Sequence, residues 1–217
     1  MLRIVSAAVL GPIAIAAAYF GGWPFALFWA AAAVAVLWEW ISLVAGPVWI
    51  IAGIGYAGIM LLAPLLLRAD NMYGFLALVL LFAIVWTTDI LGYLAGRAIG
   101  GPKLLPAISP KKSWSGAIVG TLGAMIVAVL VANYFGAFNT TAIAIIALLL
   151  SIMAQLGDLL ESWVKRQFGA KDAIHLIPGH GGVMDRLDGF WAAALVGCVI
   201  GLLRGGFDGA ARGLLVW

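Results

Sequence analysis

Charged residues gather in one stretch of this chain, residues 154–188, which reads AQLGDLLESWVKRQFGAKDAIHLIPGHGGVMDRLD. The whole sequence of 217 residues has only 12 Lys or Arg and 9 Asp or Glu residues. Nine of these charged residues lie in this stretch, together with both histidines of the chain, His175 and His180. Solubility alone does not require such a cluster in a chain with so little charge. We therefore expect the stretch to bind a multiply charged ligand.

The composition of the whole chain is that of a membrane protein. Hydrophobic residues make up 65% of the sequence and charged residues 10%, and the mean hydropathy is +1.14. Soluble domains have about 25% charged residues. The single cysteine, Cys198, excludes a disulfide framework and a cysteine-based metal site. No basic patch lies on a soluble module, so we expect no nucleic-acid binding.

Seven apolar segments predict membrane-spanning helices, each of which needs about 20 mostly apolar residues. They are Ile4–Tyr19, Trp23–Val44, Val48–Leu67, Tyr73–Leu94, Ser115–Tyr134, Thr140–Leu160 and Gly189–Leu203. The third contains several glycines, which suggest a partly re-entrant helix. The sequence predicts an all-α, polytopic integral membrane protein with about seven transmembrane helices. We expect a single membrane-embedded domain over residues 1–217, with N-terminal helices in 1–70 and the catalytic motifs in 71–217.

The distribution of basic residues predicts the orientation in the membrane. Nine of them fall on one side of the predicted bilayer: Arg3, Arg97, Lys103, Lys111, Lys112, Lys165, Arg166, Lys171 and Arg186. The other side receives Arg68, Arg204 and Arg212. We interpret Arg68 with Asp70, and Arg204 with Asp208, as solvation of the outer face. Basic residues concentrate on the cytoplasmic side of membrane proteins. Two polar loops, 95–114 and 161–188, are therefore predicted to face the cytoplasm as catalytic loops.

One face of the sixth predicted helix carries polar residues at its inner end. Asp158, Glu161, Ser162 and Lys165 are three or four residues apart, which places them about one helical turn from each other. An ion pair between Glu161 and Lys165 accounts for those two residues but leaves Asp158 unexplained at the end of an apolar run. A carboxylate at the membrane edge beside a charged loop suits a divalent cation with oxygen ligands, above all Mg²⁺.

A second pair of carboxylates, Asp185 and Asp188, follows a glycine-rich turn. One alternative is a solvated turn followed by acids that cap a helix. The nearby basic residues Arg186 and Lys171 favour a binding site instead. Carboxylates for a metal ion and basic side chains for phosphate are the components of phosphoryl or nucleotidyl transfer. For His180 we expect a structural role rather than that of a general base, because a phosphate nucleophile is already ionised near neutral pH.

The first polar loop offers a complementary set of residues. Asp89 and Tyr93 lie one turn apart before the loop, and Ser109, Lys111 and Lys112 lie in it. The two lysines alone are consistent with anchoring at the inner leaflet or attraction to anionic lipid. An intramembrane Asp89 is not explained in that way, and it favours a site for an anionic substrate.

Two features of the neighbouring helices complete this picture. Gly92 and Gly96 are four residues apart and would let their helix pack closely against another. Glu39, near the inner end of the second segment, is a weaker candidate for the site.

These motifs together resemble the signature of one enzyme family. The signature run is Ser162-Trp-Val-Lys165-Arg166, four residues, Lys171-Asp172, six residues, and Gly179-His180-Gly181-Gly182-Val183-Met184-Asp185-Arg186-Leu187-Asp188. It closely resembles that of the phosphatidate cytidylyltransferases, also called CDP-diacylglycerol synthases. Similar patterns occur at Gly157-Asp158-Leu159, at Ser109-Pro110-Lys111-Lys112, and at Asp89, Tyr93 and Gly96-Arg97. The resemblance covers roughly residues 89–188.

The resemblance implies a reaction and its site. Family members make CDP-diacylglycerol and pyrophosphate from CTP and phosphatidic acid at the inner membrane of bacteria, using Mg²⁺, and some also bind K⁺. The resemblance implies metal ligands at Asp158, Asp185 and Asp188, and catalytic residues Asp158, Lys165, Arg166, Asp185, Arg186 and Asp188. The substrate-binding residues would be Asp89, Tyr93, Arg97, Ser109, Lys111, Lys112, Ser162, Lys171, Asp172, His180, Gly181 and Gly182. A homodimer is also implied, and glycine-rich helix faces would permit it.

The sequence departs from the family pattern at two positions. Ile174 replaces a small residue, and Ser115 replaces the acid of a usual Thr-Trp-Glu-Gly segment. Two other functions remain open alternatives. The first is an ion-coupled transporter, suggested by Glu39, Asp89 and Asp158 at membrane depth. The second is a related lipid nucleotidyltransferase or kinase with another nucleotide or a polyprenyl acceptor.

Overall fold

The computed structural model describes residues 2–136, 138–170 and 182–217, and the side chains from Gly11 onward within these ranges. Its long helices are α1 (Leu2–Phe20), α2 (Gly22–Leu43), α3 (Pro47–Ala69), α4 (Gly74–Ala98), α5 (Trp114–Phe135), α6 (Thr140–Gln167) and α8 (Phe190–Gly205). The shorter elements are β1 (Lys103–Leu105), β2 (Ser109–Ser113), α7 (Met184–Leu187), η1 (Phe207–Gly209) and α9 (Ala210–Leu215). The predicted all-α, polytopic membrane class is confirmed.

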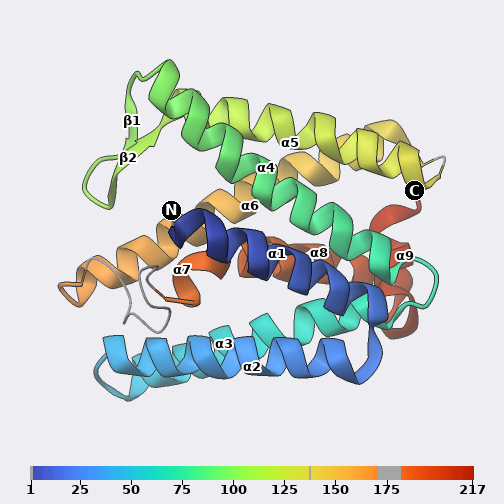
Figure 1. Cartoon of the computed structure of the whole chain (residues 1–217), viewed down its shortest axis with the longest axis horizontal. Coiled ribbons are helices and arrows are strands. Elements are labelled where there is room, and N and C mark those ends of the chain that lie inside the picture. Colours follow the sequence, from blue (N-terminus) through green and yellow to red (C-terminus); the bar gives the residue numbers. More distant parts are fainter. Residues whose placement is uncertain (1, 137, 171–181) are drawn as a thin grey trace.

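The long helices run alongside one another and share one apolar core (Figure 1). Buried side chains from α1 through α9 contribute to this core, among them Trp29 of α2, Leu81 of α4 and Phe190 of α8. Trp29 stacks on Phe190 with the ring centroids 5.0 Å apart. The start of α1, the two strands and α7 lie toward one end of the bundle, whereas α9 and the C-terminus lie toward the other (Figure 1).

The helices coincide with the seven predicted segments, although not all of them pass a strict test for a membrane span. Among the described residues, five helices are long and apolar enough, namely α2 to α6. A sixth span is formed if α8 and the segment Phe207–Leu215 count as one, and these two are bent by 116°. α3 is continuous, so the suggestion of a re-entrant third segment is wrong. Its glycine at position 53 leaves room for the indole of Trp40.

The first polar loop contains a two-stranded sheet that the sequence did not predict. β1 and β2 pair antiparallel, with Lys103 opposite Ser113 and Leu105 opposite Ser109. The hydroxyl of Ser113 accepts a hydrogen bond from the amide of Gly116 and so caps the first turn of α5. The hydroxyl of Ser115, which departs from the pattern described above, donates to the carbonyl of Gly100. This hydrogen bond connects the loop to the start of α5. The hairpin thereby projects from two fixed helix ends.

Close packing of α4 against α5 holds the inner end of α4 in place. A Cβ atom added at Gly120 would lie 2.5 Å from the carbonyl oxygen of Thr88, and one at Gly96 would lie 2.9 Å from the Ser113 hydroxyl. A Cβ at Gly92 would lie 3.4 Å from the carbonyl oxygen of Gly116. The predicted close approach at Gly92 and Gly96 is confirmed. It fixes the part of α4 that carries Asp89.

Candidate active site

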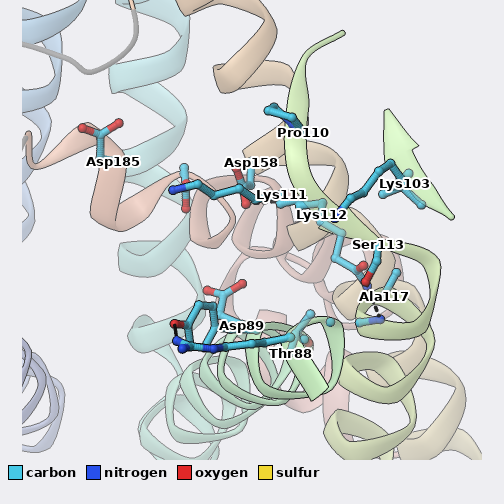
Figure 2. Close-up of a pocket in the computed structure, with 18 of the residues that line it drawn as sticks. Thr88, Asp89, Lys103, Pro110, Lys111, Lys112, Ser113, Ala117, Asp158 and Asp185 are labelled. Atoms are coloured by element: carbon cyan, nitrogen blue, oxygen red, sulfur yellow. Dashed lines mark hydrogen bonds and ion pairs between the residues drawn. The ribbon is translucent and has the colours of Figure 1, made fainter. Parts of the chain in front are cut away.

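A cavity of about 580 Å³ lies at the end of the bundle that carries the hairpin. α4, the hairpin, α5, α6 and the segment around α7 all contribute to its walls. Charged residues of both signs line it: Asp89, Arg97, Lys103, Lys111, Lys112, Asp158, Asp185, Arg186 and Asp188. Figure 2 shows Lys111 and Lys112 reaching from β2 toward Asp158, with Asp89 approaching from α4. Segments up to one hundred residues apart, from Thr88 to Asp188, thus meet around one polar space.

Asp158 is the carboxylate that joins α6 to the hairpin. Its Oδ2 atom forms an ion pair with the Nζ atom of Lys112. Its Oδ1 atom accepts a hydrogen bond of 3.4 Å from the hydroxyl of Ser162, one turn later on the same helix. Both partners of the ion pair remain partly exposed to the cavity. Because the pair is only partly buried, a charged ligand can compete for either partner.

One turn further along α6, a buried group of charges connects that helix to α7. The ammonium of Lys165 lies 3.0 Å from Glu161 Oε1 and 2.5 Å from Asp185 Oδ1. Glu161 is 2% exposed and Lys165 8% exposed. The hydroxyl of Tyr56 in α3 donates to Glu161 Oε2 over 3.4 Å. Breaking a buried pair by removing one partner leaves an uncompensated charge, so this group firmly joins α6 to α7.

Asp188, which follows α7, is partly buried close to other negative charges. Its Oδ1 atom accepts a hydrogen bond of 2.7 Å from the amide of Gly189. Burial raises the pKa of Asp188 well above its ordinary value, and the negative charges of Asp158, Glu161 and Asp89 raise this pKa further. Removing a proton from Asp188 is therefore costly unless a cation offsets the charge.

Comparison with known proteins identifies the family to which this arrangement belongs. The model of the cytidylyltransferase family matches residues 47–203. Phosphatidate cytidylyltransferase of Brucella abortus biovar 1 (strain 9-941) is 42% identical over 241 aligned positions, covering 88% of this chain and 89% of that protein. Phosphatidate cytidylyltransferase of Rickettsia bellii (strain RML369-C) is 37% identical over 196 positions, covering 86% of this chain and 84% of that protein. This chain belongs to the cytidylyltransferase family.

The family membership confirms the resemblance read from the signature, and the structure gathers many of the residues quoted for it. The cavity is lined by nine of the predicted site residues: Asp89, Tyr93, Arg97, Lys111, Lys112, Asp158, Asp185, Arg186 and Asp188. The guanidinium of Arg97 donates to the Tyr93 hydroxyl over 3.1 Å. Residues from both predicted catalytic loops therefore share one cavity.

Other predicted site residues lie elsewhere in the structure. Lys165 forms ion pairs with Glu161 and Asp185 and is not among the residues that line the cavity. In this arrangement its ammonium is not placed to contact a phosphate in the cavity. The Arg166 guanidinium donates to the carbonyls of Ile108 and Ala170 instead. Four further predicted residues, Lys171, Asp172, His180 and Gly181, fall outside the described residues.

Two more predicted residues, Ser109 and Ser162, lie beside the cavity rather than in its lining. Ser109 lies in β2, opposite Leu105 of β1. Ser162 binds Asp158, as described above. Gly182, also predicted to bind substrate, donates its amide hydrogen to Asp185 Oδ2 over 3.2 Å.

Asp158, Asp185 and Asp188 stay a prediction as metal ligands. Within the described residues, no three Asp, Glu, His or Cys side chains are gathered so as to hold a metal ion. Two of the predicted ligands, Asp158 and Asp185, form ion pairs with lysine ammonium groups. The donor chemistry nevertheless fits a hard divalent cation, because four carboxylates line one cavity and Asp188 lacks a cationic partner among the contacts described above.

Sequence reasoning missed a chain of uncharged polar groups beneath the cavity. The amide of Gln155, which lines the cavity, donates to the Thr121 hydroxyl over 2.8 Å. The Ser151 hydroxyl donates to Thr121 over 3.1 Å and shares a hydrogen bond of 2.8 Å with Thr88. Thr88, Ser151 and Gln155 each lie within an apolar run, which is the signal that could have identified them.

Proposed function

We propose that this protein condenses CTP with phosphatidic acid to give CDP-diacylglycerol and pyrophosphate. The observation that carries the proposal is the cavity at the end of a membrane-helix bundle, lined by four carboxylates and five basic side chains. A nucleotide and a lipid phosphate are both multiply anionic, and one of them is held in the bilayer by its acyl chains. Relatives in the same family that cover most of this chain have names stating the same activity.

In the proposed reaction, an oxygen of the phosphatidate phosphate attacks the α-phosphorus of CTP. The bond from that phosphorus to the bridging oxygen breaks in line, and pyrophosphate leaves with the bonding electrons. No proton has to be removed from the nucleophile, because a phosphate is already ionised near neutral pH. Catalysis then consists of positioning and of offsetting negative charge. The side chains of Arg97, Lys103, Lys111, Lys112 and Arg186 line the cavity and are suited to both tasks.

We further propose that Asp158, Asp185 and Asp188 supply oxygen ligands for Mg²⁺, with K⁺ as a second ion by family resemblance. A divalent cation bound there would offset charge on the triphosphate. Lys112 would exchange its ion pair with Asp158 for a substrate phosphate, since both partners are accessible from the cavity. Lys165 would keep Asp185 in place rather than bind phosphate, because two carboxylates already surround its ammonium.

The proposed location is the inner membrane of a bacterium, with the cavity facing the cytoplasm. The support is the excess of basic residues at the cavity end of the bundle, which the positive-inside tendency assigns to the cytoplasm. A transporter would have its ionisable residues near the bilayer midplane on broken helices. Here the charged residues border a hairpin at one end, which favours an enzyme. A homodimer and the lack of nucleic-acid binding stay predictions.

The proposal is tested with purified protein in detergent, supplied with CTP, Mg²⁺ and phosphatidic acid. Pyrophosphate release should depend on all three, and Asp158→Asn should lower kcat by about 100-fold or more. The matched control is Asp208→Asn, which alters an exposed carboxylate in η1 at the opposite end and should leave kcat unchanged. Equal turnover with ATP, or with a lipid acceptor other than phosphatidic acid, would point to the related enzyme instead. Full activity of Asp158→Asn would remove Asp158 from the site.

A further inference from the structure

A buried carboxylate of α2 binds the backbone at the start of α7. Glu39 is 0% exposed. Its Oε1 atom accepts a hydrogen bond of 2.7 Å from the amide of Val183, and its Oε2 atom accepts one of 2.7 Å from the amide of Met184. Hydrogen bonds to an ionised acceptor are shorter and stronger than neutral ones. Both carboxylate oxygens of Glu39 are therefore engaged by the same short stretch of backbone.

The contact is built to be close. A Cβ atom added at Gly182 would collide with the carboxylate of Glu39, so only glycine at this position lets the two segments approach. Met184, one of the two donors, is fully buried in the core. Glu39 also lies before the region that the family model matches, which begins at residue 47. The two hydrogen bonds of Glu39 therefore connect α2 to the turn that carries part of the family signature.

The same turn is also held through Asp185. The amide of Gly182 donates to Asp185 Oδ2, and the ammonium of Lys165 binds Asp185 Oδ1. Asp185, Arg186 and Asp188 all line the cavity. Glu39 is not among the residues that line the cavity. It contacts the backbone of the turn, whereas Asp185, Arg186 and Asp188 contribute to the cavity lining.

We propose that Glu39 is a positioning residue for the transfer reaction, acting through the backbone of residues 182–184 on Asp185 and its neighbours. This inference rests on the proposed function, since it assigns a role in that reaction to a residue which touches no substrate. The amides of Val183 and Met184 each need an acceptor, so residue 39 must present two acceptor oxygens side by side. Glutamine at this position would have nearly the same shape but would present one acceptor and one donor, so one backbone amide would lose its partner.

The structure offers a matched control for this claim. Asp70, at the opposite end of the bundle, is also buried and also binds backbone amides. Its Oδ1 atom accepts hydrogen bonds of 2.9 Å from Met72 and from Tyr73, and its Oδ2 atom accepts one of 3.1 Å from Arg212. Asp70→Asn thus removes a comparable acceptor far from the cavity. Any loss of activity that follows merely from a loosened fold will appear in both variants.

The experiment compares Glu39→Gln and Asp70→Asn with the unaltered protein in two assays. The first measures kcat and the KM for CTP on the folded fraction, together with thermal unfolding. The second measures hydrogen–deuterium exchange of the amides of Val183 and Met184. For Glu39→Gln we expect kcat to fall by about 100-fold, with little change in KM. We also expect at least one of the two amides to exchange about tenfold faster.

Asp70→Asn should lower the unfolding temperature but change neither kcat nor exchange at residues 183 and 184. Normal kcat in Glu39→Gln would overturn the proposal, as would unchanged exchange at both amides. Equal kcat losses in the two variants would also overturn it, because the effect would then be one of general stability. If the unaltered protein has no activity with CTP and phosphatidic acid, the proposed function fails. The exchange assay still decides whether Glu39 holds the turn.

Discussion

The two ends of this helix bundle use charged side chains in different ways. At the end opposite the cavity, charged groups bind backbone atoms. Arg68 donates to the carbonyls of Ala18 and Tyr19, and Asp70 accepts from three backbone amides. Arg204 donates to the carbonyl of Gly213 and lies over the Trp217 ring, 3.5 Å from its centroid. These contacts tie chain ends and turns together, and the interpretation of Arg68 and Arg204 as simple outer-face solvation is incomplete.

At the cavity end, charged groups bind mainly one another. The three ion pairs between described residues, Lys112–Asp158, Lys165–Glu161 and Lys165–Asp185, all lie there. An ion pair beside a cavity can be exchanged for a charged ligand, whereas a charged group bound to a helix terminus or turn cannot leave without loosening the fold. The comparison suggests a division between charged groups available to a ligand and charged groups that hold the structure. Glu39, Arg166 and Asp188 depart from the pattern, because they bind backbone at the cavity end.

The largest expected effect that tests this comparison is at Asp188. In the proposed site Asp188→Asn removes a metal ligand, and kcat should fall by about 100-fold or more. The same change should stabilise the protein in the presence of a chelator at neutral pH. The reason is that burial and three nearby carboxylates raise the pKa of Asp188 in the folded state. In the unfolded chain the pKa of an Asp is about 3.9.

The sign of the pH dependence follows from that difference. As pH rises above the unfolded pKa, the unfolded chain releases this proton first, so the contribution of Asp188 to stability falls until the pH exceeds the raised folded pKa. Thermal unfolding in chelator, measured from acidic to neutral pH, should show a decline attributable to Asp188 that is missing in Asp188→Asn. If Asp188→Asn is no more stable than the parent protein at neutral pH, the negative charge of Asp188 does not destabilise the folded state, and the prediction is wrong.

The site could be predicted from the sequence to the extent that its residues are charged within an apolar chain. Asp89 and Asp158 stand out for that reason, and both line the cavity. The predicted ion pair of Glu161 with Lys165 is confirmed. The pairs of Lys112 with Asp158 and of Lys165 with Asp185 could not be predicted, because both lysines were equally suited to phosphate by residue type. Which lysine is buried between two acids depends on the contact of α6 with α7. The start of α7 also binds Glu39, more than a hundred residues earlier.

The fold was predictable wherever apolar runs have the length of a membrane span. The hairpin was not, because Lys103–Leu105 and Ser109–Ser113 are too short and too polar to have a distinct pattern. Its strands are fixed by the capped start of α5 and by the close approach of α4 and α5. The bend of 116° after α8 likewise follows from tertiary packing. Glycines at 201 and 213 allow the two segments to touch there, since added Cβ atoms would collide with backbone.

A smaller effect is expected at the end opposite the cavity. Arg68→Met keeps a long apolar stem but removes the hydrogen bonds to the carbonyls of Ala18, at 2.6 Å, and Tyr19, at 3.2 Å. These carbonyls end α1, so we expect the free energy of unfolding to fall by about 2 kcal/mol. Thermal unfolding in detergent measures the loss, and kcat of the folded fraction should be unchanged. A fall in kcat without a fall in stability would contradict the division between the two ends.

The smallest effect is expected midway between the ends, at Ser151. This residue is 0% exposed and its hydroxyl links Thr88 with Thr121. Hydrogen bonds between membrane helices contribute on average only about 0.6 kcal/mol, so Ser151→Ala should lower the free energy of unfolding by about that amount. Gln155 keeps its own hydrogen bond to Thr121, so its position in the cavity should be preserved and kcat should change little. Unfolding and turnover measured on the same preparation test both expectations. A tenfold fall in kcat, about 1.4 kcal/mol in the barrier, would mean that the reactive region extends from the cavity into the polar chain between α4, α5 and α6.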